Sequence, residues 1–331
     1  MINQQSPFIQ KPQSVSVIMF MVLGALLPAI IVNVYYYGIG VLLNIILASI
    51  TALFAEFLIL KMRKIDIKSS LGDGSALVAA WLLAVSVPSI SPWWIIFIGT
   101  LFTIVVAKHF YGGLGSNLFN PAMIGYAVLL ISFPSVMTKW PASIDISMQQ
   151  SLDLFFSGTT LAIDSISSAT PLDYIKTELF QGSTISEIKN NASISMALAG
   201  IHYVAIAYFF GGLFLFFKKI ITWHLPITFL VSIIAIASLF NIIDPQQFSS
   251  PIFHLINGGT ILCAFFIITD PVSGPTTSRG KIVFAFLAAL IILLIRNFGG
   301  YPEGIAFAVI FLNICVPLID KLTQPKVFGH D

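Results

Sequence analysis

Long apolar runs separated by short polar segments make up most of this chain. A helix needs about 20 predominantly apolar residues to cross the hydrocarbon core of a bilayer. The pattern predicts ten membrane-spanning helices, at about 15–36, 39–60, 74–90, 93–110, 118–134, 194–217, 225–243, 252–269, 281–296 and 303–319. The third and eighth are short and bounded by Gly, Asp and Pro, a pattern typical of helices that are interrupted.

The composition agrees with this pattern. Of 331 residues, 57% are hydrophobic and 9% are charged, whereas soluble domains have about 25% charged residues. With a mean hydropathy of +0.95, the chain is predicted to be an all-α integral membrane protein in contact with lipid. The net charge of +2 comes without a basic cluster, so no nucleic-acid partner is expected. The polar stretch 1–13 and the span-length run after it argue against a cleavable signal peptide.

The distribution of basic residues predicts the orientation, because cytoplasmic loops are enriched in Lys and Arg. If both termini are cytoplasmic, the inside segments contain twelve of the sixteen basic residues and the outside segments contain four. An even number of spans also returns the C-terminus to the side of the N-terminus. We therefore expect both termini in the cytoplasm and the long polar loop on the opposite side.

This loop divides the chain into three predicted parts: a first five-helix repeat at 1–134, a loop at 135–193 and a second five-helix repeat at 194–331. The loop has 59 residues, with six acidic residues and three lysines. A passive linker between two bundles is one interpretation. Long loops without regular structure are uncommon and often functional, so a role in function is the other.

The two halves resemble each other at an offset of 184 residues. Residues 71–77 align with 255–261, 112–117 align with 296–301, and 87–88 lie against 270–271 after a shift of one residue. Because each half has five spans, the second would be inverted in the membrane, as in folds whose broken helices build a central site from both halves. Chance similarity between apolar segments is the competing explanation, but the matches fall on Gly, Asp, Asn and Pro.

Three breaks in the helices are candidate ligand positions, because irregular backbone at membrane depth must be buried in protein or line a cavity. They lie at 72–74, 117–121 and 269–271, all expected on the cytoplasmic side. Asn117 and Asn120 offer amide donors and acceptors and Asp270 offers acceptors, a mixture suited to a flat heteroaromatic ring. Helix capping is the commoner role of Asn and Asp before Pro and explains the same residues.

Other ionisable groups in or near the predicted spans are also candidates for function. They are Glu56, Asp73, Arg296 and Glu303. Glu56 lies near Lys61 at the end of its predicted span, so its side chain can instead extend to place the carboxylate in water. Arg296 and Glu303 flank a short turn, where they would be solvated or paired with each other. The His and Cys residues have no metal-ligand spacing, so a metal site or a cysteine-ligated iron–sulfur cluster is not expected.

The loop contains the segment Asp164-Ser-Ile-Ser-Ser-Ala-Thr170. Taken alone it is a turn of small residues, and a Thr in such a turn usually has no chemical role. The segment resembles the acceptor motif for covalent flavin attachment, Asp-x-x-Ser/Thr-Gly-Ala-Thr, with Ser168 where Gly is common. In that motif a flavin transferase joins FMN to the last Thr through a phosphodiester bond, which here implies Thr170.

Further segments resemble the family of D subunits of the Rnf electron-transport complexes. The family with the next strongest resemblance is that of the B subunits of the sodium-pumping NADH:quinone reductases. The similar segments are 73–77, 119–122, 265–280, 298–308, 317–320 and 327–330. The resemblance covers nearly the whole chain. It implies a membrane component of an ion-translocating oxidoreductase of the bacterial inner membrane, multi-pass, with the loop 135–193 in the periplasm.

The resemblance also implies cofactors and partners. It implies covalent FMN at Thr170 and a non-covalent riboflavin near Asn117, Asn120 and Asp270. The Rnf complex would couple electron transfer between NADH and ferredoxin, or another low-potential acceptor, to cation transport. The partners would be the A, B, C, E and G subunits, and a flavin transferase is needed for maturation. A solute channel or secondary transporter fits inverted five-helix repeats equally well, and a structural subunit without flavin is the third hypothesis.

Overall fold

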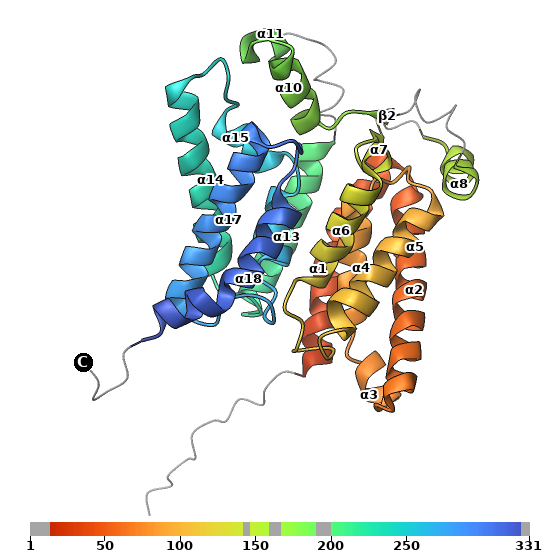
Figure 1. Ribbon diagram of the computed structural model, residues 1–331. Coiled ribbons are helices and arrows are strands. Elements are labelled where there is room, and N and C mark those ends of the chain that lie inside the picture. Colours follow the sequence, from red (N-terminus) through yellow and green to blue (C-terminus); the bar gives the residue numbers. More distant parts are fainter. Residues whose placement is uncertain (1–13, 142–145, 159–166, 190–199, 326–331) are drawn as a thin grey trace, which may run out of the picture.

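A computed structural model describes residues 14–141, 146–158, 167–189 and 200–325 of the chain. In these parts the regular secondary structure is helical apart from two short strands, and the elements follow one another along the sequence (Figure 1). The helices of the first half are α1 (Val15–Tyr37), α2 (Gly40–Arg63), α3 (Ile67–Leu71), α4 (Ser75–Ser86), α5 (Trp93–Leu101), the π-helical segment η1 (Phe102–His109), α6 (Pro121–Ser132) and α7 (Pro134–Met137). Those of the second half are α13 (Ile201–Phe217), α14 (His224–Ile243), α15 (Pro251–Ile256), α16 (Thr260–Leu262), the π-helical segment η2 (Cys263–Ile267), α17 (Ser278–Phe298) and α18 (Ile305–Thr323).

The prediction of an all-α membrane protein is confirmed. Within the described residues, five helices are long and apolar enough to cross a membrane: α1, α2, α14, α17 and α18. The other five predicted spans coincide with shorter apolar helices, namely α4, α5 with η1, α6, α13, and the interrupted segment 251–267. The 12 residues of α4 extend about 18 Å, less than the roughly 30 Å hydrocarbon core, so irregular backbone must lie at membrane depth beside them.

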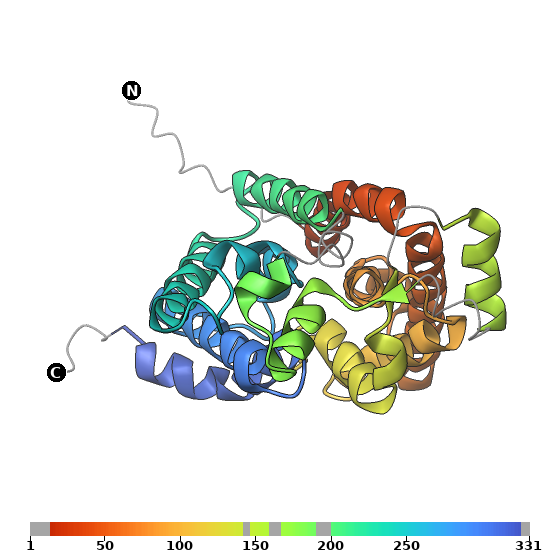
Figure 2. The same ribbon diagram turned by 90° about the horizontal axis from the view of Figure 1, so that it is seen from above.

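The helices form two bundles that stand side by side (Figures 1 and 2). In the first, α2 packs against α4 and α5, and in the second, α14 packs against α17. The bundles meet where α1 packs against α13 and where α6 packs against α18. Gly211 makes the first contact possible, because a Cβ there would lie 2.1 Å from the backbone oxygen of Ala25. Small residues allow such close helix approach in membranes.

The loop between the bundles contains regular structure that was not predicted from the sequence. Helices α8 (Met148–Ser157), α10 (Pro171–Phe180) and α11 (Ile185–Lys189) lie in it, with strands β1 (Trp140–Pro141) and β2 (Ser167–Ser168) paired antiparallel. Local signals for two of these helices were present: Ser147 and Gln150 form a capping box at α8, and Thr170 caps α10 with Pro171 behind it. These helices lie at the end of the molecule opposite the start of α1 and the end of α18 (Figure 1).

Two helix breaks at opposite ends of the bundles share one arrangement. Gly74 precedes α4 with φ +76°, and Gly258 precedes α16 with φ +68°, a conformation that favours glycine. A basic side chain then donates to the hydroxyl at the start of each following helix: Lys108 to Ser75 at 2.7 Å and Arg296 to Thr260 at 2.9 Å. The first break follows α3 and the second follows α15, at opposite ends in Figure 1. This correspondence supports the predicted inverted repeat, which stays a prediction.

Candidate functional site

Thr170 is the N-cap residue of α10. Its backbone is extended, and its Oγ1 accepts a hydrogen bond from the backbone N–H of Asp173 at 3.2 Å. Pro171 occupies the first helical position, where its missing N–H costs nothing. The Thr170 side chain is partly exposed. The predicted turn is therefore the start of a helix, and the hydroxyl sits on ordered backbone. Asp164, the first residue of the predicted motif, lies outside the described residues.

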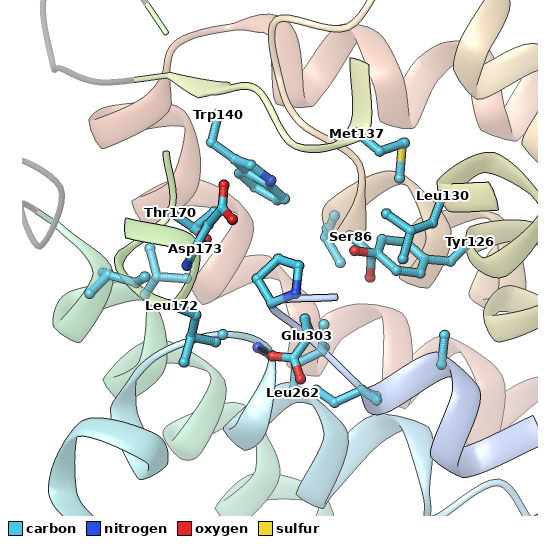
Figure 3. A pocket seen from close by; sticks show the side chains of 18 of the residues that line it. Ser86, Tyr126, Leu130, Met137, Trp140, Thr170, Leu172, Asp173, Leu262 and Glu303 are labelled. Atoms are coloured by element: carbon cyan, nitrogen blue, oxygen red, sulfur yellow. Dashed lines mark hydrogen bonds between the residues drawn. The ribbon is translucent and has the colours of Figure 1, made fainter. Parts of the chain in front are cut away.

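The segment before Thr170 is held by strand pairing. Ser168 of β2 pairs with Trp140 of β1, and Ser167 pairs with Pro141. This pairing joins two distant parts of the long loop and brings the Trp140 indole to the same side as Thr170 (Figure 3). Trp140 was not identified from the sequence, because a two-residue strand leaves no detectable alternation of polar and apolar positions.

Thr170 lines a cavity of about 180 Å³. We call it the Thr170 cavity; residues from the loop and from both bundles line it, among them Tyr126, Trp140, Thr170, Asp173, Gly258 and Glu303. Its walls are mostly apolar, with the phenol of Tyr126, the indole of Trp140 and the carboxylate of Glu303 on different sides (Figure 3). An apolar, aromatic cavity with a few polar groups is the usual form of a small-molecule site.

Arg296 fixes the carboxylate of Glu303 at this cavity. Its guanidinium donates to Glu303 Oε2 at 2.6 Å and to Oε1 at 3.1 Å, and to the backbone oxygen of His254 at 2.9 Å. The backbone N–H of Gly259 also donates to Glu303 Oε2, at 3.2 Å. The Arg296 side chain is only 1% exposed. Of the two predicted alternatives, pairing is confirmed and solvation is wrong.

Helix α10 is attached to the second bundle by Lys176. Its Nζ donates to the backbone oxygens of Ile295 at 3.0 Å and Tyr301 at 2.7 Å. Burial lowers the pKa of the Lys176 amine, and burial raises the pKa of the Asp173 carboxyl in the first turn of the same helix. The contacts of Lys176 therefore hold the helix that begins after Thr170 against the second bundle.

The three residues predicted near a second ligand lie around one other cavity. This cavity has a volume of about 210 Å³, and we call it the Asn120 cavity; its lining includes Ser75, Lys108, Asn117, Asn120, Phe266 and Asp270. Residues of both bundles thus line this cavity, which agrees with the prediction that the helix breaks of the two halves lie close together. A flavin at this cavity stays a prediction.

Hydrogen bonds show that one of these residues, Asn120, caps a helix and that Asp270 stabilises a turn. Asn120 is the N-cap of α6: its Oδ1 accepts from Met123 N–H at 3.3 Å, and its Nδ2 donates to the backbone oxygen of Ile267 at 3.1 Å. Asp270 accepts from Val272 N–H and from Ser273 Oγ. The amide of Asn120 nevertheless has a second N–H, because an amide nitrogen carries two. Capping therefore leaves hydrogen-bonding capacity at the cavity.

A buried ionic cluster adjoins the Asn120 cavity. Glu56 is 2% exposed, pairs with Lys108 through Oε1 and lies 3.2 Å from Nε2 of His109. The predicted alternative that Glu56 reaches out of the membrane is wrong, because Lys108 meets its carboxylate inside the bundle. Asp73, at the break before α4, accepts from both the backbone N–H and the hydroxyl of Ser75. Lys108 was missed as a site residue, since pairing across 52 positions has no local signal in the sequence.

Comparisons with known proteins agree on one family. The profile of the NQR2, RnfD, RnfE family matches residues 2–329. A relative from Salmonella arizonae, the D subunit of an ion-translocating oxidoreductase complex, is 47% identical over 342 residues, covering 98% of this chain and 97% of the relative. The protein of the same name from Klebsiella pneumoniae (strain 342) is also 47% identical, covering 98% of each.

Proposed function

Since this chain belongs to the NQR2, RnfD, RnfE family, we propose that it is the flavin-carrying membrane subunit of an ion-translocating oxidoreductase complex in the bacterial inner membrane. Its activity would couple electron transfer between NADH and ferredoxin, or another low-potential acceptor, to cation transport. The A, B, C, E and G subunits of the Rnf complex and a flavin transferase are the partners. The observation that carries the proposal is that Thr170 lines a mostly apolar cavity together with Trp140 and Tyr126.

The residues around Thr170 fit an attached FMN. Attachment replaces the hydroxyl hydrogen by a bond from Oγ1 to the phosphorus of the flavin nucleotide, from which an oxygen-linked leaving group departs with that proton, and it leaves Oγ1 able to accept from Asp173 N–H. The phosphodiester would sit at the N-terminus of α10, where backbone N–H groups lack intrahelical partners and favour an anion. The walls of the Thr170 cavity, with Trp140 and Tyr126, suit a flat apolar ring.

The roles of the cavity residues follow from their contacts. The bound flavin supplies a reversible electron carrier. Trp140 and the apolar walls shield the ring from water, and Lys176 keeps α10 in place over the cavity. Glu303, held by Arg296, offers a fixed acceptor on the opposite wall. This arrangement orients the ring without requiring movement of the bundle helices.

The donor set and the aromatic lining of the Asn120 cavity support a non-covalent riboflavin there. The amides of Asn117 and Asn120 have N–H groups that their intramolecular hydrogen bonds do not use up, and Asp270 supplies carboxylate acceptors. Phe265 and Phe266 provide aromatic surface. The hydrocarbon core is about 30 Å thick, so carriers near both ends of the bundle would divide the distance that an electron must cross.

Replacing Asn120 tests the riboflavin assignment. Asn120→Leu should lower the non-covalent flavin of the purified protein severalfold and leave the covalent flavin unchanged. Because Leu also removes the cap of α6, at a cost of about 1 kcal/mol, the matched variant is Asn120→Ser, which keeps a cap oxygen and lacks the amide. Flavin released by denaturation is quantified by chromatography. Full riboflavin content in both variants would contradict the assignment.

The orientation is tested by cysteine labelling in intact cells. A cysteine at Phe180, 95% exposed in α10, should react with an impermeant maleimide, and one at Lys218, in the turn after α13, should not. The reason is that twelve of sixteen basic residues then face the cytoplasm. The parent protein, with Cys263 and Cys315, gives the background. The reverse labelling pattern would mean that the loop faces the cytoplasm.

A further inference from the structure

A basic side chain, Lys108, lines the Asn120 cavity. It is 3% exposed and lies near the end of η1. Its Nζ pairs with Glu56 Oε1 and donates to Ser75 Oγ at 2.7 Å. A protonated lysine has three N–H donors, so these two contacts leave one of them available at the cavity.

The partners of Lys108 are themselves fixed. Glu56 lies within α2 and also contacts His109, while Ser75 donates to Asp73 at the break before α4. The Lys108 head group is thus held from α2 and from the start of α4. A long side chain in a fixed place loses little entropy when a ligand arrives, which is the condition for a preorganised contact.

A positive charge at this place has a specific consequence for a flavin. Reduction of the isoalloxazine by two electrons with uptake of one proton leaves a negative charge at its pyrimidine end, and protein charge near that end tunes the cofactor. The electrons come from the preceding carrier of the complex. Charge interactions are strong where the surroundings are apolar, and the lining of this cavity includes Val78, Leu82 and Phe266.

We propose that Lys108 contacts the pyrimidine end of the flavin in the Asn120 cavity and stabilises its reduced, anionic form. Glu56 and Ser75 then act as positioning residues that hold the lysine head group. The inference rests on the proposed riboflavin site and adds to it the residue that sets the redox potential. A lysine with a purely structural role would instead affect folding and leave the preference between oxidised and reduced flavin unchanged.

The test compares the full chain carrying Thr170→Ala, which lacks covalent flavin, with the same chain carrying Lys108→Gln in addition. Because loss of Lys108 alone removes the lysine partner of a buried carboxylate and leaves it only His109, a third variant carries Glu56→Gln together with Lys108→Gln. Dissociation constants for riboflavin are measured with the flavin oxidised and with it reduced by dithionite. Re-addition of riboflavin allows the ratio to be measured even where the purified variant has lost its flavin.

Lys108→Gln should bind reduced riboflavin at least tenfold less well relative to oxidised riboflavin. For a two-electron couple a tenfold change is a fall of about 30 mV in midpoint potential, which spectroelectrochemical titration measures independently. The variant that also loses the Glu56 charge should show a smaller loss in the same direction, because the more distant carboxylate partly offsets the lysine charge. Lys108→Arg should stay near the parent value, and so should Lys61→Gln, an exposed lysine of α2. An unchanged ratio in the double variant would overturn the role of Lys108. Absence of riboflavin binding in the Thr170→Ala parent would instead overturn the riboflavin site itself.

Discussion

Thr170→Ala is expected to remove all covalent flavin from the chain and to stop electron transfer through the complex. The phosphodiester needs the Thr170 hydroxyl, and the Ala side chain has none. The membrane bundles should still fold, because Thr170 lies in the loop and caps only α10, a contribution of about 1 kcal/mol. In-gel flavin fluorescence of the protein expressed with its flavin transferase measures the first effect, and electron transfer in membranes measures the second.

Thr177→Ala is the matched control for this variant. Thr177 is an exposed threonine of the same helix, so its variant should keep full fluorescence. Fluorescence that survives in Thr170→Ala would refute the assignment of Thr170. Fluorescence missing from the parent protein as well would favour the alternatives without a covalent flavin, a structural subunit or an inverted-repeat channel.

Arg296→Met should destabilise the second bundle by about 3–5 kcal/mol, the usual cost of removing one partner of a buried ion pair. Arg296 is 1% exposed and joins Glu303 to the backbone oxygens of the break between α15 and α16. Without it the Glu303 carboxylate and these oxygens lose their strongest donor. The measurement is the temperature of half-aggregation of the protein in detergent, which should fall by several degrees.

Arg279→Met provides the control on the same helix. Arg279 is exposed in the first turn of α17, so its loss should change the aggregation temperature little. A second variant, Arg296→Met with Glu303→Gln, removes the unpaired carboxylate and should recover part of the loss. Equal temperatures for Arg296→Met and Arg279→Met would show that the pair contributes no stability.

Much of the fold was predictable because the length of each apolar segment can be measured in the local sequence. The ten apolar segments of the sequence coincide with helices. The breaks before Ser75 and at Gly258 each contain a glycine, and a glycine can be identified from the sequence alone. Helices α8 and α10 were missed because they are short and half-polar, and β1 because two residues have no periodicity. Length and polarity were enough to identify the loop that contains them, while its helices depend on packing against the bundles.

The candidate site was predictable where a motif is contiguous and not where it forms across the fold. Thr170 stands at the end of a recognisable segment, and Asn117 and Asn120 lie beside a Pro that starts α6. Lys108 and Glu56 are 52 residues apart, and Arg296 reaches back to His254 over 42. Such contacts arise only when helices pack, because a buried charge requires a partner that can lie far away in the sequence.

The central claim, that this chain carries FMN on Thr170, is tested most directly by mass spectrometry of the wild-type protein expressed with its flavin transferase. Trypsin cleavage after Lys139 and Lys176 releases the peptide 140–176, which contains Thr159, Thr160 and Thr170. We predict this peptide with the added mass of FMN less one water, and fragmentation should localise the addition to Thr170. The unmodified peptide alone, or an addition localised to Thr159 or Thr160, would contradict the account.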